Sequence, residues 1–133
     1  MRRHQKDPKT SKFFIEVNRN HPITRQRFTV AHEIAHFVKH PKVLAEKGQL
    51  DRTRTFKDEA EIQREDEADE EAAAILMPEY LVEDYFKTKS WSKKTKFDSE
   101  MISEVAESFR VSRAMAITRL RDLDFPIPYI SFA

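Results

Sequence analysis

Two histidines four residues apart, with a glutamate directly after the first, are the residues of this sequence best suited to chemistry. They are His32, Glu33 and His36, within the stretch Val30–Val38. In an α-helix, a turn of roughly 100° per residue places His36 about 40° and Glu33 about 100° from His32, so the three share one face. Two imidazoles beside a carboxylate are typical of a zinc site with an adjacent general base. The alternative is a surface helix that carries two histidines by chance.

The rest of this stretch predicts how the helix packs. No charge interrupts its apolar positions, which a buried helix requires. Opposite the chemical face we expect a core face, formed by Val30, Ala31, Ile34, Phe37 and Val38.

A further histidine, His40, stands eight residues after His32. On a straight helix the Cα atoms of these two residues lie about 12 Å apart, too far to share a zinc ion bound at about 2 Å. We therefore place His40 at the C-terminus of the helix, where an imidazole suits the helix dipole. The third metal ligand must come from another element.

That element is the acidic stretch Glu59–Leu76, which we interpret as a second helix. Glu65 and Asp69 lie in the middle of its apolar stripe on a helical wheel. Because burying a carboxylate without a partner is expensive, this position indicates a cation or strong donors. We predict Glu65 as the third zinc ligand, Asp69 as the acceptor of a hydrogen bond from a ligand histidine, and Glu61 as the reserve ligand. The other acids are expected to face solvent: Asp66, Glu67, Glu70 and Glu71.

Three segments, in this order, resemble the ImmA/IrrE family of metallopeptidases: Arg27–His36, Glu65–Asp69 and Ala73–Pro78. The similarity covers roughly residues 13–125. These segments in the expected order are a much more specific sign of the family than His32, Glu33 and His36 alone. The chain departs from the family in two ways. It is shorter before the helix that carries His32 and His36, and it has Glu71 where an aromatic residue is usual.

The resemblance implies a zincin-like, mostly helical α+β domain with a small N-terminal β-sheet. It implies that His32, His36 and Glu65 are the metal ligands and that Glu33 is the catalytic base. It also implies an endopeptidase that cleaves a helix-turn-helix transcriptional repressor of phage, mobile-element or stress-response genes. The expected ion is zinc, although two histidines and a glutamate also accept manganese or another divalent ion.

Composition limits the other possibilities. The chain has 133 residues, of which 39% are hydrophobic, 35% are charged and one is glycine, as suits one helix-rich domain. The absence of cysteine excludes disulfides, thiolate ligands and a cysteine nucleophile. A net charge of +1 gives no overall field that favours nucleic acid. Without a long apolar run or a leader-like start, we expect a cytoplasmic protein with no membrane contact.

Elements that position the two helices can also be predicted. Residues 1–12 are basic, with little to bury, and are expected to form a flexible arm before a single domain at residues 13–133. A strand is expected at residues 13–18. Thr24 is the expected N-cap of the metal-binding helix, which should run from residue 25 to about His40 and stop at Pro41. The long connection at residues 41–58 could roof the metal cleft.

The second half of the sequence predicts three more helices. They are expected at residues 79–86 with Pro78 in the first turn, at residues 99–109 capped by Asp98 or Ser99, and at residues 113–123 capped by Ser112. Residues 125–132 are expected to be extended and to pack on the domain or on a partner. An oxyanion donor is also expected, with four candidates: Arg27, Tyr80, Tyr85 and Arg119.

Two other functions remain open from the sequence. The chain could be a non-proteolytic regulator or toxin-like partner that keeps the scaffold and acts by binding a repressor or antitoxin. It could also be a helix-turn-helix module whose last two helices bind DNA, with Arg113, Arg119 and Arg121 contacting phosphates. An intact base beside intact ligands favours the enzyme over the first, and near-zero net charge counts against direct nucleic-acid binding.

Overall fold

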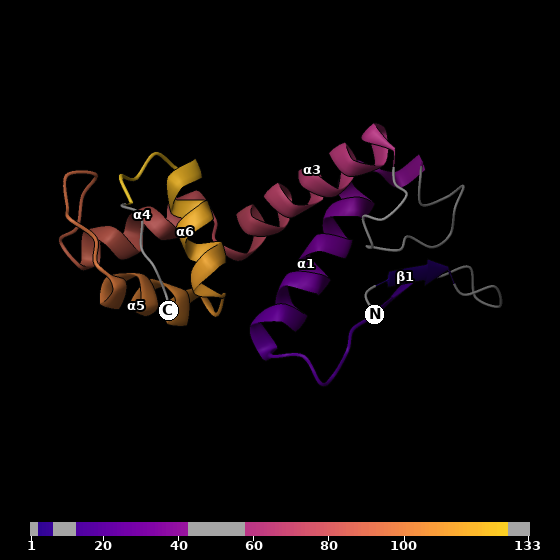
Figure 1. The fold of residues 1–133 in the computed structure, drawn as a ribbon, viewed down its shortest axis with the longest axis horizontal. Coiled ribbons are helices and arrows are strands. Elements are labelled where there is room, and N and C mark those ends of the chain that lie inside the picture. The colour runs from indigo at the N-terminus through magenta and orange to yellow at the C-terminus, as the bar shows by residue number, and fades with distance from the viewer. Residues whose placement is uncertain (1–2, 7–12, 43–57, 128–133) are drawn as a thin grey trace. The chain divides into compact units, whose positions relative to one another are not determined.

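The computed structural model describes residues 3–6, 13–42 and 58–127, and Figure 1 labels all of their elements except β2. The order is β1 (Arg3–Lys6), β2 (Phe13–Glu16), α1 (Ile23–Lys39), α3 (Glu59–Leu76), α4 (Glu79–Thr88), α5 (Ser99–Phe109) and α6 (Arg113–Asp122). The predicted class, α+β and mostly helical with a small N-terminal sheet, is confirmed. The chain divides into two compact units, residues 1–72 and 73–133, and the boundary falls within α3. The single domain at residues 13–133 stays a prediction.

Strands β1 and β2 form an antiparallel two-stranded sheet in which Arg3 lies opposite Glu16 and Lys6 opposite Phe13. The flexible basic arm predicted for residues 1–12 is therefore wrong for residues 3–6. Pairing with β2 satisfies the backbone hydrogen bonds of this segment whatever its side chains are. Its polar sequence therefore did not indicate a strand. The remainder of the predicted arm lies outside the described residues.

Helix α1 begins at Ile23 and ends at Lys39, close to its predicted bounds. The prediction that Thr24 caps it is wrong. Pro22 occupies the N-cap with φ −54°, and its carbonyl accepts hydrogen bonds from the amides of Arg25 and Gln26, both at 3.0 Å. This closes the first turn without a side-chain cap. The predicted roof at residues 41–58 lies almost wholly outside the described residues.

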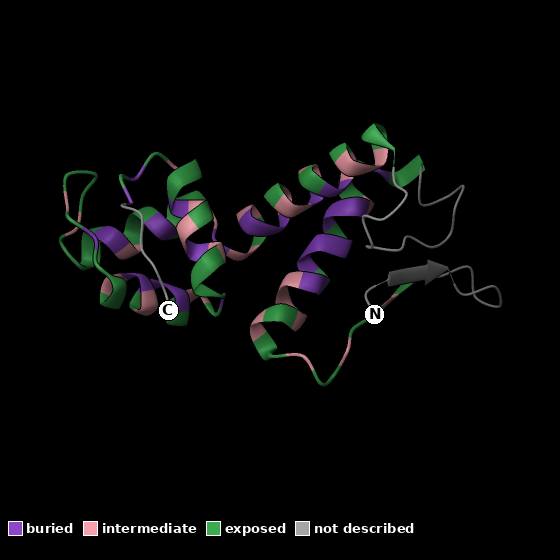
Figure 2. Cartoon of the chain, in the orientation of Figure 1, coloured by how far each residue is buried: buried purple, intermediate pink, exposed green. Residues whose placement is uncertain are grey.

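The face that α1 buries differs from the prediction. Its buried residues are Thr29, Ala31, His32, Glu33, Ala35 and His36. Of the expected core face, Ala31 is buried as predicted, but Val30, Ile34 and Val38 are 37%, 40% and 66% exposed. Figure 2 shows the long buried segment of α1 in purple. The helix therefore buries its chemical face, because its ionisable side chains find partners on α3.

Helix α3 supplies those partners from a stripe of small residues. Ala68 and Ala72 are fully buried and lie three and seven residues after Glu65, so all three share one side of the helix. Alanines at these positions let two helices approach closely. Glu65 is itself only 4% exposed, as its place in the apolar stripe predicts.

The unit at residues 73–133 has a separate hydrophobic core. Helices α4, α5 and α6 contribute most of its buried side chains: Met77, Val82, Phe86, Phe97, Ile102, Val105, Ala106, Val111, Ala116, Leu120, Phe125 and Ile127. Phe86 lies near its centre, with ring centroids 4.4 Å from Phe125 and 5.5 Å from Trp91. Helices α5 and α6 pack against each other within this unit.

Side-chain caps set the ends of α5 and α6. Asp98 accepts a hydrogen bond from the Met101 amide at 2.8 Å, and Ser112 from the Met115 amide at 3.1 Å. These caps were predicted. Helix α4 begins after Pro78 but continues to Thr88, two residues beyond its predicted end.

The arginines considered as phosphate ligands also make contacts within this unit. Arg119 Nε donates to the Met77 carbonyl at 3.0 Å, and Arg113 donates to Ser103 Oγ at 3.2 Å. These contacts favour a packing role for the two helices. The extended tail is described only as far as Ile127, which is buried.

Candidate metal centre

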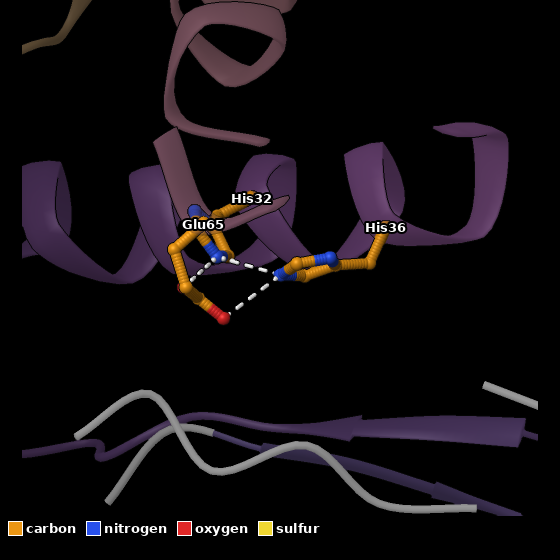
Figure 3. Close-up of side chains that lie close together, drawn as sticks. All are labelled: His32, His36 and Glu65. Carbon is orange, nitrogen blue, oxygen red and sulfur yellow. Dashed lines mark hydrogen bonds and ion pairs between the residues drawn. The ribbon is translucent and has the colours of Figure 1, made fainter. Parts of the chain in front are cut away.

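Three side chains from α1 and α3 converge on one point, as Figure 3 shows. His32 Nε2 lies 2.9 Å from Glu65 Oε2, and His36 Nε2 lies 3.3 Å from Glu65 Oε1. The two Nε2 atoms are 3.0 Å apart. All three residues are buried, and within the described ranges they are the group that could hold a metal ion. The structure thus brings together the three predicted ligands.

The spacing of these atoms fits a tetrahedral ion. Zinc bound by nitrogen and oxygen at about 2.0–2.2 Å places neighbouring ligand atoms about 3.3–3.5 Å apart. The observed separations of 2.9, 3.0 and 3.3 Å are close to this edge length. Two imidazoles and one carboxylate also leave a fourth position for water or substrate, as catalytic zinc sites do.

The outer nitrogen of His32 has an acidic partner on α3. His32 Nδ1 lies 2.7 Å from Asp69 Oδ1, and the side chain of Asp69 is 35% exposed. Because an ionised carboxylate only accepts hydrogen bonds, His32 Nδ1 must carry the proton. In the neutral ring, Nε2 then presents a lone pair to the cluster. This is the contact predicted for Asp69, and it orients a ligand for a metal ion.

The electrostatics of the cluster also suit a cation. Burial lowers the pKa of His36 and so favours the neutral ring that a metal requires, although hydrogen bonding to Glu65 opposes this change. Burial opposes ionisation of Glu65, but its hydrogen bonds with His32 and His36 prevail and hold its pKa well below the usual range. Because an ionised carboxylate only accepts hydrogen bonds, these bonds need a proton on the facing imidazole nitrogens, and a bound cation would take the place of that proton. The residues present therefore fit a bound divalent ion.

Glu33, the predicted base, is fully buried on α1 next to His32. The negative charge of Glu33 raises the pKa of His36. Thr29, one turn earlier on the same side, is 1% exposed. The role of Glu33 stays a prediction.

Sequence reasoning missed two residues beside the cluster. His40 Nδ1 lies 3.0 Å from His36 Nδ1, and His40 Nε2 lies 3.0 Å from Glu67 Oε2. The expectation that Glu67 only faces solvent is therefore wrong, although its side chain is 42% exposed. The spacing of His36 and His40 at i and i+4 was the available signal for the first contact. The second depends on how α3 crosses α1.

The other predicted site residues lie outside this cluster. The reserve ligand Glu61 is not among the three that converge, and its backbone amide donates to Asp58 Oδ1 at the start of α3. Of the four oxyanion candidates, only Arg27 belongs to the unit that holds the cluster. The other three, Tyr80, Tyr85 and Arg119, belong to residues 73–133.

Comparison with known proteins identifies the family. A comparison with curated proteins gave no match. Among the described residues, no helix is both long and apolar enough to cross a membrane. The family model for the IrrE N-terminal-like domain, Peptidase M78, matches residues 2–121, which is most of the chain. The resemblance found in the sequence is thus confirmed, and the chain belongs to the IrrE N-terminal-like family of metallopeptidase-like domains.

Proposed function

We propose that this chain is a zinc-dependent endopeptidase that cleaves a helix-turn-helix transcriptional repressor. The observation that carries the proposal is the convergence of His32, His36 and Glu65, together with the burial of Glu33, which follows His32 on the same helix. Membership of a peptidase family supports the reaction class. The choice of a repressor as the substrate rests on the family resemblance. A repressor substrate implies that the reaction takes place in the cytoplasm.

In this proposal the chain holds zinc through two imidazole nitrogens and the carboxylate of Glu65. A zinc ion there would lower the pKa of water and polarise a peptide carbonyl. Glu33 takes a proton from the water that attacks the scissile carbonyl carbon, then transfers it to the leaving amine nitrogen as the C–N bond breaks. Asp69 keeps the ring of His32 turned toward the cluster through its hydrogen bond to Nδ1.

A cleavage assay with a matched variant tests this function. Wild type and Glu33→Gln, each loaded with zinc, are incubated with the helix-turn-helix protein encoded nearest to this chain. The products are identified by mass spectrometry. The amide is nearly isosteric with the carboxylate, and Glu33 is not a ligand in this scheme, so metal and substrate binding should survive. Turnover should fall by about 10²–10⁴-fold, the usual contribution of a general base.

Wild type should make a discrete cut that a chelator abolishes. The proposal fails if wild type and Glu33→Gln relieve repression equally in cells and neither protein cuts the repressor. That result would assign this chain to the non-proteolytic binding proteins.

A further inference from the structure

A chain of hydrogen-bonding groups continues from the ligand His36 to the surface of α3. His36 Nδ1 contacts His40 Nδ1 at 3.0 Å, and His40 Nε2 contacts Glu67 Oε2 at 3.0 Å. Gln63 donates to the other oxygen of Glu67 at 3.1 Å. His36 is 1% exposed and His40 is 8% exposed, so their ring nitrogens need protein partners.

We propose that His40 and Glu67 form a positioning pair that fixes the ring of His36 with its Nε2 lone pair directed at the metal centre. This inference rests on the proposed metal site and adds two residues that hold it in shape. Neither residue touches the metal or the substrate in this scheme. Their effect passes through His36.

The direction of each hydrogen bond follows from the acidic end of the chain. An ionised Glu67 only accepts, so His40 Nε2 must carry a proton. A neutral His40 then has a bare Nδ1, which can only accept. His36 Nδ1 is then the donor to His40, and the lone pair of a neutral His36 lies on Nε2, the nitrogen that would bind a metal ion. In the metal-free chain the carboxylate of Glu65 competes with this arrangement, because its Oε1 lies 3.3 Å from Nε2 and can accept from it. The carboxylate of Glu67 thus selects the tautomer of a histidine that it does not contact.

Backbone geometry supports the same role. The His40 amide donates to the His36 carbonyl at 2.8 Å at the end of α1, which fixes the spacing of the two residues. Their ring centroids lie 5.2 Å apart. Glu67 stands two residues after Glu65, so α3 provides both a ligand and the support of another ligand. The two ligand histidines are held alike, His32 by Asp69 directly and His36 by Glu67 through His40.

Two measurements on the full chain test the pair. The first is the ring tautomer of His36 in the metal-free protein at neutral pH, from long-range ¹H–¹⁵N NMR correlations, measured in a Glu65→Ala background so that no carboxylate of residue 65 accepts from Nε2. The second is zinc affinity, from competition with a chromophoric chelator. Four variants are compared with wild type: His40→Ala, His40→Asn, Glu67→Ala and the double variant His40→Ala/Glu67→Ala. Glu70→Ala serves as the control, because Glu70 is an exposed acid on the same helix.

In the Glu65→Ala background we expect His36 to be protonated at Nδ1, and we expect the addition of His40→Ala to shift it toward the Nε2–H form. Zinc affinity should fall by about 10–100-fold in His40→Ala and by about 10-fold in Glu67→Ala. His40→Asn should recover most of it, since its amide oxygen can accept from His36 Nδ1. Glu67→Ala should add no further loss to His40→Ala, because the pair acts as a unit. Glu70→Ala should match wild type.

The pair is overturned if His36 is protonated at Nε2 in the Glu65→Ala background, or if the losses of zinc affinity in the two single variants simply add. It is also overturned if His40→Asn binds zinc as weakly as His40→Ala. Failure of the proposed function looks different. In that case neither wild type nor Glu33→Gln cuts the repressor, while zinc affinity and the tautomer of His36 still show whether His40 and Glu67 position the ring.

Discussion

Removing the carboxylate of Asp69 should weaken zinc binding without abolishing it. In Asp69→Ala, the N–H at Nδ1 of His32 loses its acceptor, which lies 2.7 Å away in the structure. His32 is fully buried, so its ring is poorly placed to recruit a water molecule instead. The ligand itself remains, but its tautomer and orientation are no longer fixed.

The magnitude follows from the kind of hydrogen bond that is lost. A hydrogen bond to a charged group contributes about 1.5–3 kcal/mol. Because the side chain of Asp69 is 35% exposed, solvent screens it and the lower half of this range applies. A loss of about 1.5–2 kcal/mol corresponds to zinc binding roughly 10–30-fold weaker, since 1.4 kcal/mol is tenfold.

Zinc affinity at pH 7, measured by chelator competition, checks this value. Asp69→Asn keeps an acceptor oxygen and should lie between wild type and Asp69→Ala. Glu70→Ala, one residue further along α3 and exposed, should bind as wild type does. Unchanged affinity in Asp69→Ala, or equal losses in Asp69→Ala and Glu70→Ala, would refute the assignment of Asp69.

Three further predictions concern the ligands, the pH dependence and the core. Glu65→Ala should lose its metal in elemental analysis while Glu61→Ala retains it; the reverse result would show that the wrong carboxylate was chosen. The pKa values of His36 and Glu65 are both lowered in the folded state, so the unfolded chain binds more protons. The metal-free protein should therefore lose stability as pH falls below about 6.5, because unfolding then lets His36 take up a proton, and again below about 4.5, because unfolding then lets Glu65 take up a proton. Denaturant unfolding at several pH values measures this. A free energy of unfolding that rises on acidification would contradict it. Phe86→Ala should reduce the free energy of unfolding by about 3–5 kcal/mol, because Phe86 is 3% exposed among other aromatic rings; a loss below about 1 kcal/mol in denaturant unfolding would show that this core is not well packed.

The cluster could be predicted because its members depend on helical period alone. The spacing of His32 and His36 fixes a common face, and the apolar stripe of α3 singles out Glu65 and Asp69. The caps of α5 and α6 were found for a similar reason, since Asp98 and Ser112 bond to amides three residues away.

What depends on packing could not be predicted in the same way. A helical wheel shows which residues share a face, but not what covers that face, so the exposed stripe of Val30, Ile34 and Val38 was assigned to the core. The contact of His40 with Glu67 requires the crossing geometry of two helices. Strand β1 escaped detection because backbone pairing with β2 needs no apolar side chains.

The central claim is that α1 and α3 together build one metal centre from two imidazoles and one carboxylate. X-ray absorption at the zinc edge of the zinc-loaded full chain, combined with metal stoichiometry, tests it most directly. We expect about one zinc ion per chain, nitrogen and oxygen neighbours at about 2.0–2.1 Å, and the multiple-scattering signature of two imidazoles. His36→Ala and Glu65→Ala should remove the ion. Zinc retained at full stoichiometry in both variants, or a shell without two imidazoles, would contradict the account.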